Sequence, residues 1–88
     1  MLLVVDIGNT NIVFGLFEGD EIKSHWRISS DKSRTSDEYG VLFKKLIEIK
    51  EIETKQINGA AISCVVPTLL ETILEAINTY FEVDPIIV

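Results

Sequence analysis

Apolar residues recur along the chain first with the period of a β-strand and then with that of an α-helix. Residues 1–5 are all apolar, and residues 12–17 and 21–29 alternate between two faces. The first two runs are joined by Gly8-Asn9 and the last two by Glu18-Gly19-Asp20, and both are typical turn sequences. The pattern therefore predicts three strands in an antiparallel meander.

The rest of the chain alternates helical and strand-like segments. Thr35 and Glu38 have the spacing of a capping box, and a helical apolar stripe follows them to about Lys50. Residues 58–66 form a small apolar run without alternation, as in a strand that is buried on both faces. A second helical stripe comes next, and residues 85–88 begin another apolar strand.

The predicted element order is β-β-β-α-β-α-β, which makes residues 1–88 an α/β domain. A three-stranded meander continued by βα units is the plan of the ribonuclease H-like fold. Right-handed crossovers place the strands at 1–5, 60–66 and 86–88 side by side and parallel in a mixed sheet, with the helices on its faces. Because the chain stops inside an apolar strand, we expect a truncated domain. The expected core residues are Leu3, Val5, Phe14, Leu42, Phe43, Leu46, Ile62, Val65, Leu70, Ile73 and Ile77.

The strand at 21–29 has one apolar and one polar face. Ile22 and Trp26 are expected to share the packed face, while His25 and Arg27 lie on the other. His25 is interpreted as a surface residue, since a metal site normally needs further ligands. Arg27 has two interpretations, as a plain surface residue or as a cation that helps to neutralise a bound nucleotide.

Composition narrows the function classes. The 88 residues are 47% hydrophobic, as in a folded chain, and the net charge of −6 argues against nucleic acid and anionic membrane surfaces as partners. Cys64 is the one cysteine, which excludes an internal disulfide and agrees with a cytoplasmic location. It is interpreted as a buried, inert thiol. No apolar run approaches the ~20 residues of a membrane span.

The clearest candidate for a binding site in the sequence is the stretch Asp6-Ile7-Gly8-Asn9-Thr10-Asn11. A tight glycine turn leaves backbone N–H groups pointing outward, and such groups bind anions. A carboxylate beside a phosphate site is explained if a cation lies between them, and Mg²⁺ binds through one or two carboxylates together with substrate phosphates. The turn is therefore a candidate site for a metal–nucleotide complex. The alternative is a plain hairpin in which Asp6 and Asn9 only satisfy the turn backbone.

Four short motifs follow one another along the chain: Asp6-Ile7-Gly8-Asn9-Thr10-Asn11, Trp26-Arg27-Ile28-Ser29, Arg34-Thr35-Ser36-Asp37-Glu38-Tyr39 and Ser63-Cys64-Val65-Val66-Pro67-Thr68. Together they resemble the N-terminal portion of type III pantothenate kinase, a family in the superfamily of acetate and sugar kinases, actin and heat-shock chaperones. In that superfamily an Asp-x-Gly-x-Thr hairpin between the first two strands cradles the ATP phosphates. The resemblance extends over essentially all 88 residues.

The resemblance implies a function for these residues. The family phosphorylates pantothenate with ATP, the first step of coenzyme A synthesis, and it uses Mg²⁺ and a monovalent cation, K⁺ or NH₄⁺. It is typically a homodimer. By this resemblance Asp6 holds the metal through water, and Val65 lines the pantothenate pocket. The ATP-binding turn then comprises Asp6, Ile7, Gly8, Asn9, Thr10, Asn11, Ile12 and Val13.

The family's later motifs have no counterpart in these residues. The resemblance places the catalytic base in a Gly-x-Asp-Arg stretch, so we expect that base beyond residue 88, together with the monovalent-cation ligand and a second domain. The chain is thus expected to be an ATP-phosphate half-site that is inactive by itself. Two alternatives stay open: a non-catalytic relative with an accessory function in transcription, and a nucleotide-binding module.

Overall fold

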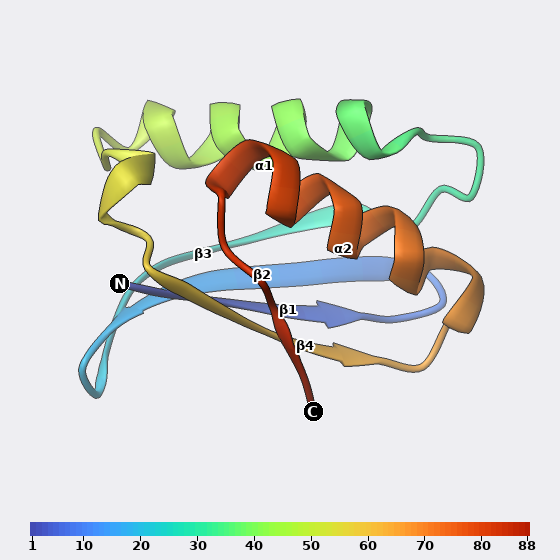
Figure 1. Ribbon diagram of the computed structural model, residues 1–88, viewed down its shortest axis with the longest axis horizontal. Helices are drawn as coiled ribbons and strands as arrows, with labels where there is room; N and C mark the ends of the chain where they lie inside the picture. Colours follow the sequence, from blue (N-terminus) through green and yellow to red (C-terminus); the bar gives the residue numbers. More distant parts are fainter.

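The computed structural model describes every residue from Met1 to Val88. It consists of one five-stranded sheet, two α-helices and a short 3₁₀ helix (Figure 1). The strands are β1 (Leu2–Ile7), β2 (Asn11–Glu18), β3 (Glu21–Ser29), β4 (Gly59–Cys64) and β5 (Ile86–Ile87). The helices are α1 (Ser36–Ile49), η1 (Thr54–Gln56) and α2 (Pro67–Phe81). The predicted order of strands and α-helices is confirmed, and the 3₁₀ helix is added between α1 and β4.

The sheet has the strand order β3-β2-β1-β4-β5 and combines two kinds of pairing. The pairs β1–β2 and β2–β3 are antiparallel, whereas β1–β4 and β4–β5 are parallel. The first, fourth and fifth strands therefore lie side by side and parallel, as predicted. This mixed sheet confirms the α/β class that the sequence pattern indicates.

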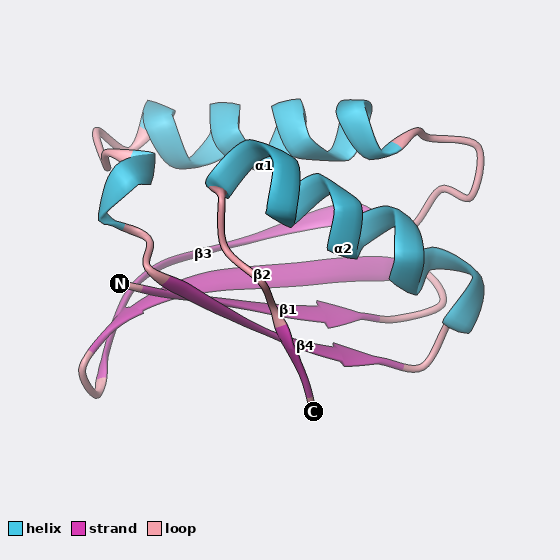
Figure 2. Ribbon diagram, in the orientation of Figure 1, coloured by secondary structure: helices cyan, strands magenta, loops and turns pink.

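Both α-helices cover the same face of the sheet (Figure 2). The connections from β3 to β4 and from β4 to β5 contain α1 and α2, and both cross the sheet in the same direction. Right-handed crossovers in one direction place their helices on one face. The expected burial of residues 58–66 on both faces is therefore wrong, and β4 instead alternates between buried and more exposed residues. We call the uncovered face, which carries Val4, Asp6, Val13 and His25, the open face.

The core lies between the sheet and the two helices. Most of the predicted core residues are buried, namely Leu3, Val5, Phe14, Phe43, Ile62, Ile73 and Ile77. Three others, Leu42, Leu46 and Leu70, are only half-buried. The prediction that Val65 belongs to the core is wrong, since its side chain is 67% exposed. Successive side chains point to opposite faces of a strand, so the neighbouring Val66 points inward and is buried instead.

A β-bulge changes the predicted faces of β3. The register between β2 and β3 shifts between Leu16 and Phe17, so that Phe17 pairs with Ile22. Ile22 consequently lies on the open face and is 50% exposed, and the prediction that it shares the packed face with Trp26 is wrong. Trp26 does pack inward, with its ring stacked on Phe14 at 5.0 Å between centroids.

The start of α1 is fastened to α2. A Cβ atom at Gly40 would overlap the ring of Tyr80, so only glycine permits the two helices to approach this closely. The Tyr80 hydroxyl donates a hydrogen bond of 2.8 Å to the Asp37 carboxylate. The predicted capping box of Thr35 and Glu38 is also present at this end of α1. These contacts give the loop before α1 a fixed end point.

Candidate functional site

Asp6 lies near the carboxyl end of β1 on the open face, and its side chain is exposed. In the sheet register it pairs with Val13 on β2 and with Ser63 on β4. The Ser63 hydroxyl donates a hydrogen bond of 3.3 Å to Asp6 Oδ1. Val13 pairs in turn with Arg27 on β3. These four residues thus form one row across the open face, which we call the Asp6 row.

The turn between β1 and β2 comprises Gly8, Asn9 and Thr10. The Gly8 N–H closes it with a hydrogen bond of 2.9 Å to the Asn11 carbonyl. A Cβ atom at Gly8 would lie 2.9 Å from that carbonyl oxygen, so the position needs glycine for lack of space. Asn9 and Thr10 are exposed, and their backbone N–H groups have no hydrogen-bond partner within the chain. Two free donors at the end of a strand are a ready site for an anion.

The other predicted turn residues have different environments. Ile7 and Ile12 pair with each other and are fully buried, so only their backbones can reach a ligand. Asn11 begins β2 and is half-buried, and Val13 is half-buried on the open face. The structure therefore brings the predicted residues together around one turn, at the edge of the sheet that carries Asp6.

Ser30 completes this site and is not marked by any sequence pattern. Its hydroxyl donates a hydrogen bond of 2.6 Å to the Gly8 carbonyl. Its backbone N–H donates a second one, of 2.8 Å, to the Thr10 carbonyl. Its partners are main-chain oxygens 22 and 20 positions earlier in the chain, and neither residue type nor periodicity signals such a contact. The turn is therefore held from the end of β3.

The loop after β3 is itself held by hydrogen bonds. The Asp31 carboxylate accepts bonds from the hydroxyl and the N–H of Ser33, at 2.6 and 2.9 Å. These bonds, the hydroxyl's first, hold the pKa of Asp31 below its ordinary value. The Asp31 N–H donates to the Tyr39 hydroxyl at 2.9 Å, and that hydroxyl donates to the Asp31 carbonyl at 2.7 Å. The Arg34 guanidinium lies 5.7 Å from the centre of the Tyr39 ring. The loop is thereby fixed to α1.

Val65 lies at the same edge of the sheet as the turn. Its N–H donates a hydrogen bond of 3.1 Å to the Ile7 carbonyl, which ties the segment after β4 to the end of β1. Its exposed side chain is free to meet a ligand that reaches this edge. The neighbouring Cys64 is half-buried, and its thiol donates to the Val66 carbonyl at 3.1 Å.

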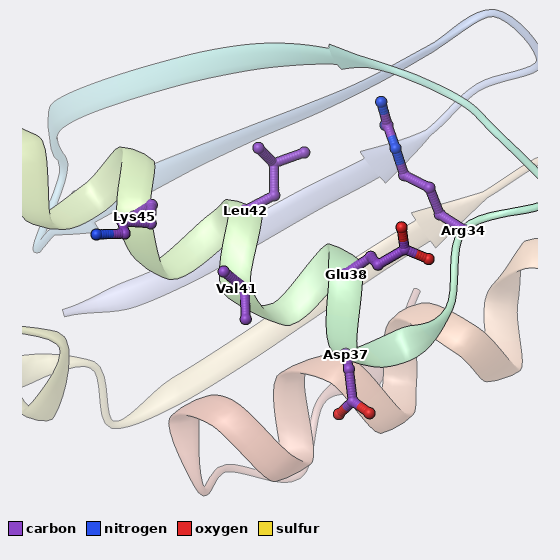
Figure 3. A pocket seen from close by; sticks show the side chains of 6 residues that line it. All are labelled: Arg34, Asp37, Glu38, Val41, Leu42 and Lys45. Carbon is purple, nitrogen blue, oxygen red and sulfur yellow. The ribbon is translucent and has the colours of Figure 1, made fainter.

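The largest pocket lies away from the turn, on the outer side of α1 (Figure 3). Its volume is about 480 Å³, and it is lined by Arg34, Asp37, Glu38, Val41, Leu42 and Lys45. No predicted site residue lines it. A smaller hollow of about 210 Å³ lies on the open face, where Asp6, Val13 and His25 contribute to its wall. The hollow on the open face therefore adjoins the Asp6 row, whereas the larger pocket on α1 does not.

The side chains around Asp6 fit one kind of metal site. No group of three or more His, Cys, Asp or Glu side chains comes together in this chain, so its own side chains do not build a closed metal cage. A single exposed carboxylate can instead hold a Mg²⁺ ion together with the phosphates of a ligand, and the free backbone N–H groups beside it can bind those phosphates. The geometry thus agrees with a metal–nucleotide site.

Comparison with solved structures gives the fold first. The chain superposes with a TM-score of 0.69 on the crystal structure of a protein from Porphyromonas gingivalis named "putative N-acetylglucosamine kinase". The match covers 99% of this chain and 33% of that chain, at 15% sequence identity. A likeness at this identity shows the fold alone. The chain has the actin-like ATPase fold of the sugar kinases.

Comparison of sequences then defines the family. The family model described as "Type III pantothenate kinase" matches residues 2–88. Proteins named type III pantothenate kinase from Brevibacillus brevis, an Exiguobacterium species and Moorella thermoacetica are 48%, 44% and 42% identical over 88 residues. The chain belongs to the type III pantothenate kinase family. All of this chain is matched, and it spans 34–35% of the length of these relatives.

Proposed function

We propose that this chain is the phosphate-binding N-terminal part of a pantothenate kinase, which transfers the γ-phosphoryl group of ATP to pantothenate in the first step of coenzyme A biosynthesis. One observation carries this assignment: the exposed Asp6 carboxylate adjoins a turn with two free backbone donors. Phosphoryl transfer depends on positioning and on offsetting phosphate charge, and a metal-side carboxylate next to an anion site serves both. Membership of the family supports pantothenate as the acceptor.

The turn binds the phosphates of ATP in this proposal. The free N–H groups of Asn9 and Thr10 donate to phosphate oxygens, and their exposed side chains add further polar contacts. Gly8 keeps the turn tight, so that the chain passes close to the ligand. Asn11 and Val13 extend the contact along β2 toward the open face.

Asp6 holds Mg²⁺ through water, and the Ser63 hydroxyl orients the carboxylate. When it is bound, the metal offsets negative charge on the phosphates. A monovalent cation, K⁺ or NH₄⁺, is proposed as a further cofactor, with ligands outside residues 1–88.

The acceptor approaches from the β4 side, where the exposed Val65 lines the pantothenate pocket in this proposal. A general base must lie within hydrogen-bond reach of the hydroxyl whose proton it takes. Asp6 is engaged on the metal side, and no cluster of acidic or histidine side chains surrounds it. We therefore propose that the base lies outside residues 1–88.

The whole protein is proposed to be a cytoplasmic homodimer that binds neither nucleic acid nor membranes. The net charge of −6 on residues 1–88 supports the absence of nucleic acid and anionic membrane partners, and the single cysteine in these residues supports a cytoplasmic location. Neither α-helix is long and apolar enough to cross a membrane.

The test is a coupled assay of ADP release by the full-length protein that carries these residues at its N-terminus. We expect release that requires pantothenate, Mg²⁺ and K⁺ or NH₄⁺, and none with N-acetylglucosamine as the acceptor. Nucleotide binding without any pantothenate-dependent release would overturn the kinase assignment in favour of a non-catalytic relative.

A further inference from the structure

We infer that Ser30 is a positioning residue for ATP: it holds the Gly8–Thr10 turn in its phosphate-binding shape through two hydrogen bonds. This inference rests on the proposed function. Ser30 lies just after β3, outside the turn itself, and is half-buried. Its hydroxyl bonds the Gly8 carbonyl at 2.6 Å, and its N–H bonds the Thr10 carbonyl at 2.8 Å.

The two hydrogen bonds of Ser30 fix carbonyl groups of the turn, whose direction affects the binding of an anion. A carbonyl oxygen repels phosphate, and Ser30 engages the two carbonyls that flank Asn9 on either side. The Gly8 carbonyl and the Asn9 N–H belong to one planar trans peptide group and point in opposite directions, so fixing that carbonyl toward Ser30 keeps the Asn9 N–H free for a ligand. The bond to the Thr10 carbonyl holds the other end of the turn. Donors that are oriented in advance bind more tightly, because no ordering remains to be done on binding.

Ser30 can fix the turn because its own neighbour is fixed. The backbone of Asp31 makes two hydrogen bonds with the Tyr39 hydroxyl, at 2.9 and 2.7 Å. Tyr39 is fully buried in α1, so its hydroxyl is a rigid anchor. A continuous chain of contacts therefore leads from the core through Tyr39, Asp31 and Ser30 to the phosphate turn.

The experiment compares Ser30→Ala, Ser30→Thr and Ser33→Ala in the full-length protein. Ser33 is a matched control, because its hydroxyl also makes a loop hydrogen bond of 2.6 Å, but to Asp31 and not to the turn. We expect Ser30→Ala to raise the KM for ATP about tenfold, the size of effect that one lost hydrogen bond produces. The KM for pantothenate should change less than about twofold. Ser30→Thr, which keeps a hydroxyl, should restore the ATP value, and Ser33→Ala should match the wild type.

Amide hydrogen exchange gives a second readout that does not depend on turnover. The Gly8 N–H, which is bonded to the Asn11 carbonyl, should exchange at least about fivefold faster in Ser30→Ala and at the wild-type rate in Ser33→Ala. An unchanged KM for ATP with unchanged Gly8 exchange would overturn the inference. So would equal effects of Ser30→Ala and Ser33→Ala. A wild-type protein without pantothenate-dependent turnover would instead refute the proposed function, and the Gly8 exchange would still decide whether Ser30 orders the turn.

Discussion

Ser63 donates a hydrogen bond to Asp6 across the two central parallel strands, and the two residues are 57 positions apart in the sequence. The bond is 3.3 Å long and is exposed to solvent. It restrains Asp6 Oδ1 without burying the carboxylate, so Oδ2 keeps no hydrogen bond within the chain. A carboxylate that is oriented but still open to solvent suits a metal held through water.

Ser63→Ala should lower kcat/KM for MgATP by about two- to fivefold, since a long, exposed hydrogen bond contributes little. The free energy of unfolding should change by less than about 0.5 kcal/mol, because Ser63 is at the surface. Steady-state kinetics and thermal denaturation check both values. A loss above about a hundredfold would contradict an orienting function for Ser63.

Arg27→Ala should raise the KM for ATP about five- to tenfold with little effect on stability. Arg27 stands in the Asp6 row, two strands from Asp6 and hence roughly 10 Å away between Cα atoms, and it forms no salt bridge with a carboxylate of this chain. An unpaired guanidinium at that distance can reach phosphates bound between the two residues. The control is His25→Ala on the same face. An unchanged KM for ATP would leave Arg27 as a plain surface residue.

Gly8→Ala and Gly19→Ala compare the two hairpin turns. The first places a Cβ against the Asn11 carbonyl, and the second forces a side chain into a φ of +61° in open space. Both substitutions should destabilise the fold, by about 1–3 kcal/mol for the steric overlap and about 1–2 kcal/mol for the backbone strain. Only Gly8→Ala should raise the KM for ATP, by at least about tenfold, because only that turn is proposed to bind phosphate. Equal effects of the two variants on the KM would contradict the site.

The hydrogen bond from Tyr80 to Asp37 predicts a pH dependence at the junction of the helices. Because the Asp37 carboxylate accepts this bond, it raises the pKa of Tyr80 above 10.0. A folded pKa above the unfolded one means that the stabilisation is fully present below pH 10 and is lost as the pH rises through the folded value. Asp37→Asn should move the phenolate titration of Tyr80 toward lower pH, as followed by ultraviolet absorbance. Tyr39→Phe in both backgrounds removes the signal of the other tyrosine in residues 1–88, and identical midpoints would refute the bond.

Much of the fold could be predicted from the periodicity of apolar residues in the sequence. The strands and helices follow from runs such as Met1–Val5 and from the stripe that contains Phe43, because burial of one face requires those periods. The position of Ile22 does not follow, since a bulge changes strand parity without changing the residue pattern. Both helices cover one face because both crossovers run in the same direction across the sheet. The pattern within a single strand or helix does not show that direction.

The candidate site was predictable only where residue type carries the chemistry. Asp6 and Gly8 stand out, because a carboxylate beside a glycine turn needs an explanation. Ser30 does not stand out in the sequence, since its proposed function depends on hydrogen bonds to main-chain oxygens, and no pattern of side chains predicts such bonds. The exposure of Val65 also escapes sequence reasoning, because an apolar residue after an apolar strand resembles core.

The most direct test of the whole account is the turnover of Asp6→Asn in the full-length protein, with pantothenate and MgATP. The substitution keeps the size of the side chain and removes the negative charge that is proposed to hold the metal. Asp20→Asn, in the other hairpin turn and also exposed, is the control. We predict that Asp6→Asn lowers kcat at least about a hundredfold, while the free energy of unfolding changes by less than about 0.5 kcal/mol. Wild-type turnover in Asp6→Asn would contradict the assignment of this turn as the metal–nucleotide site.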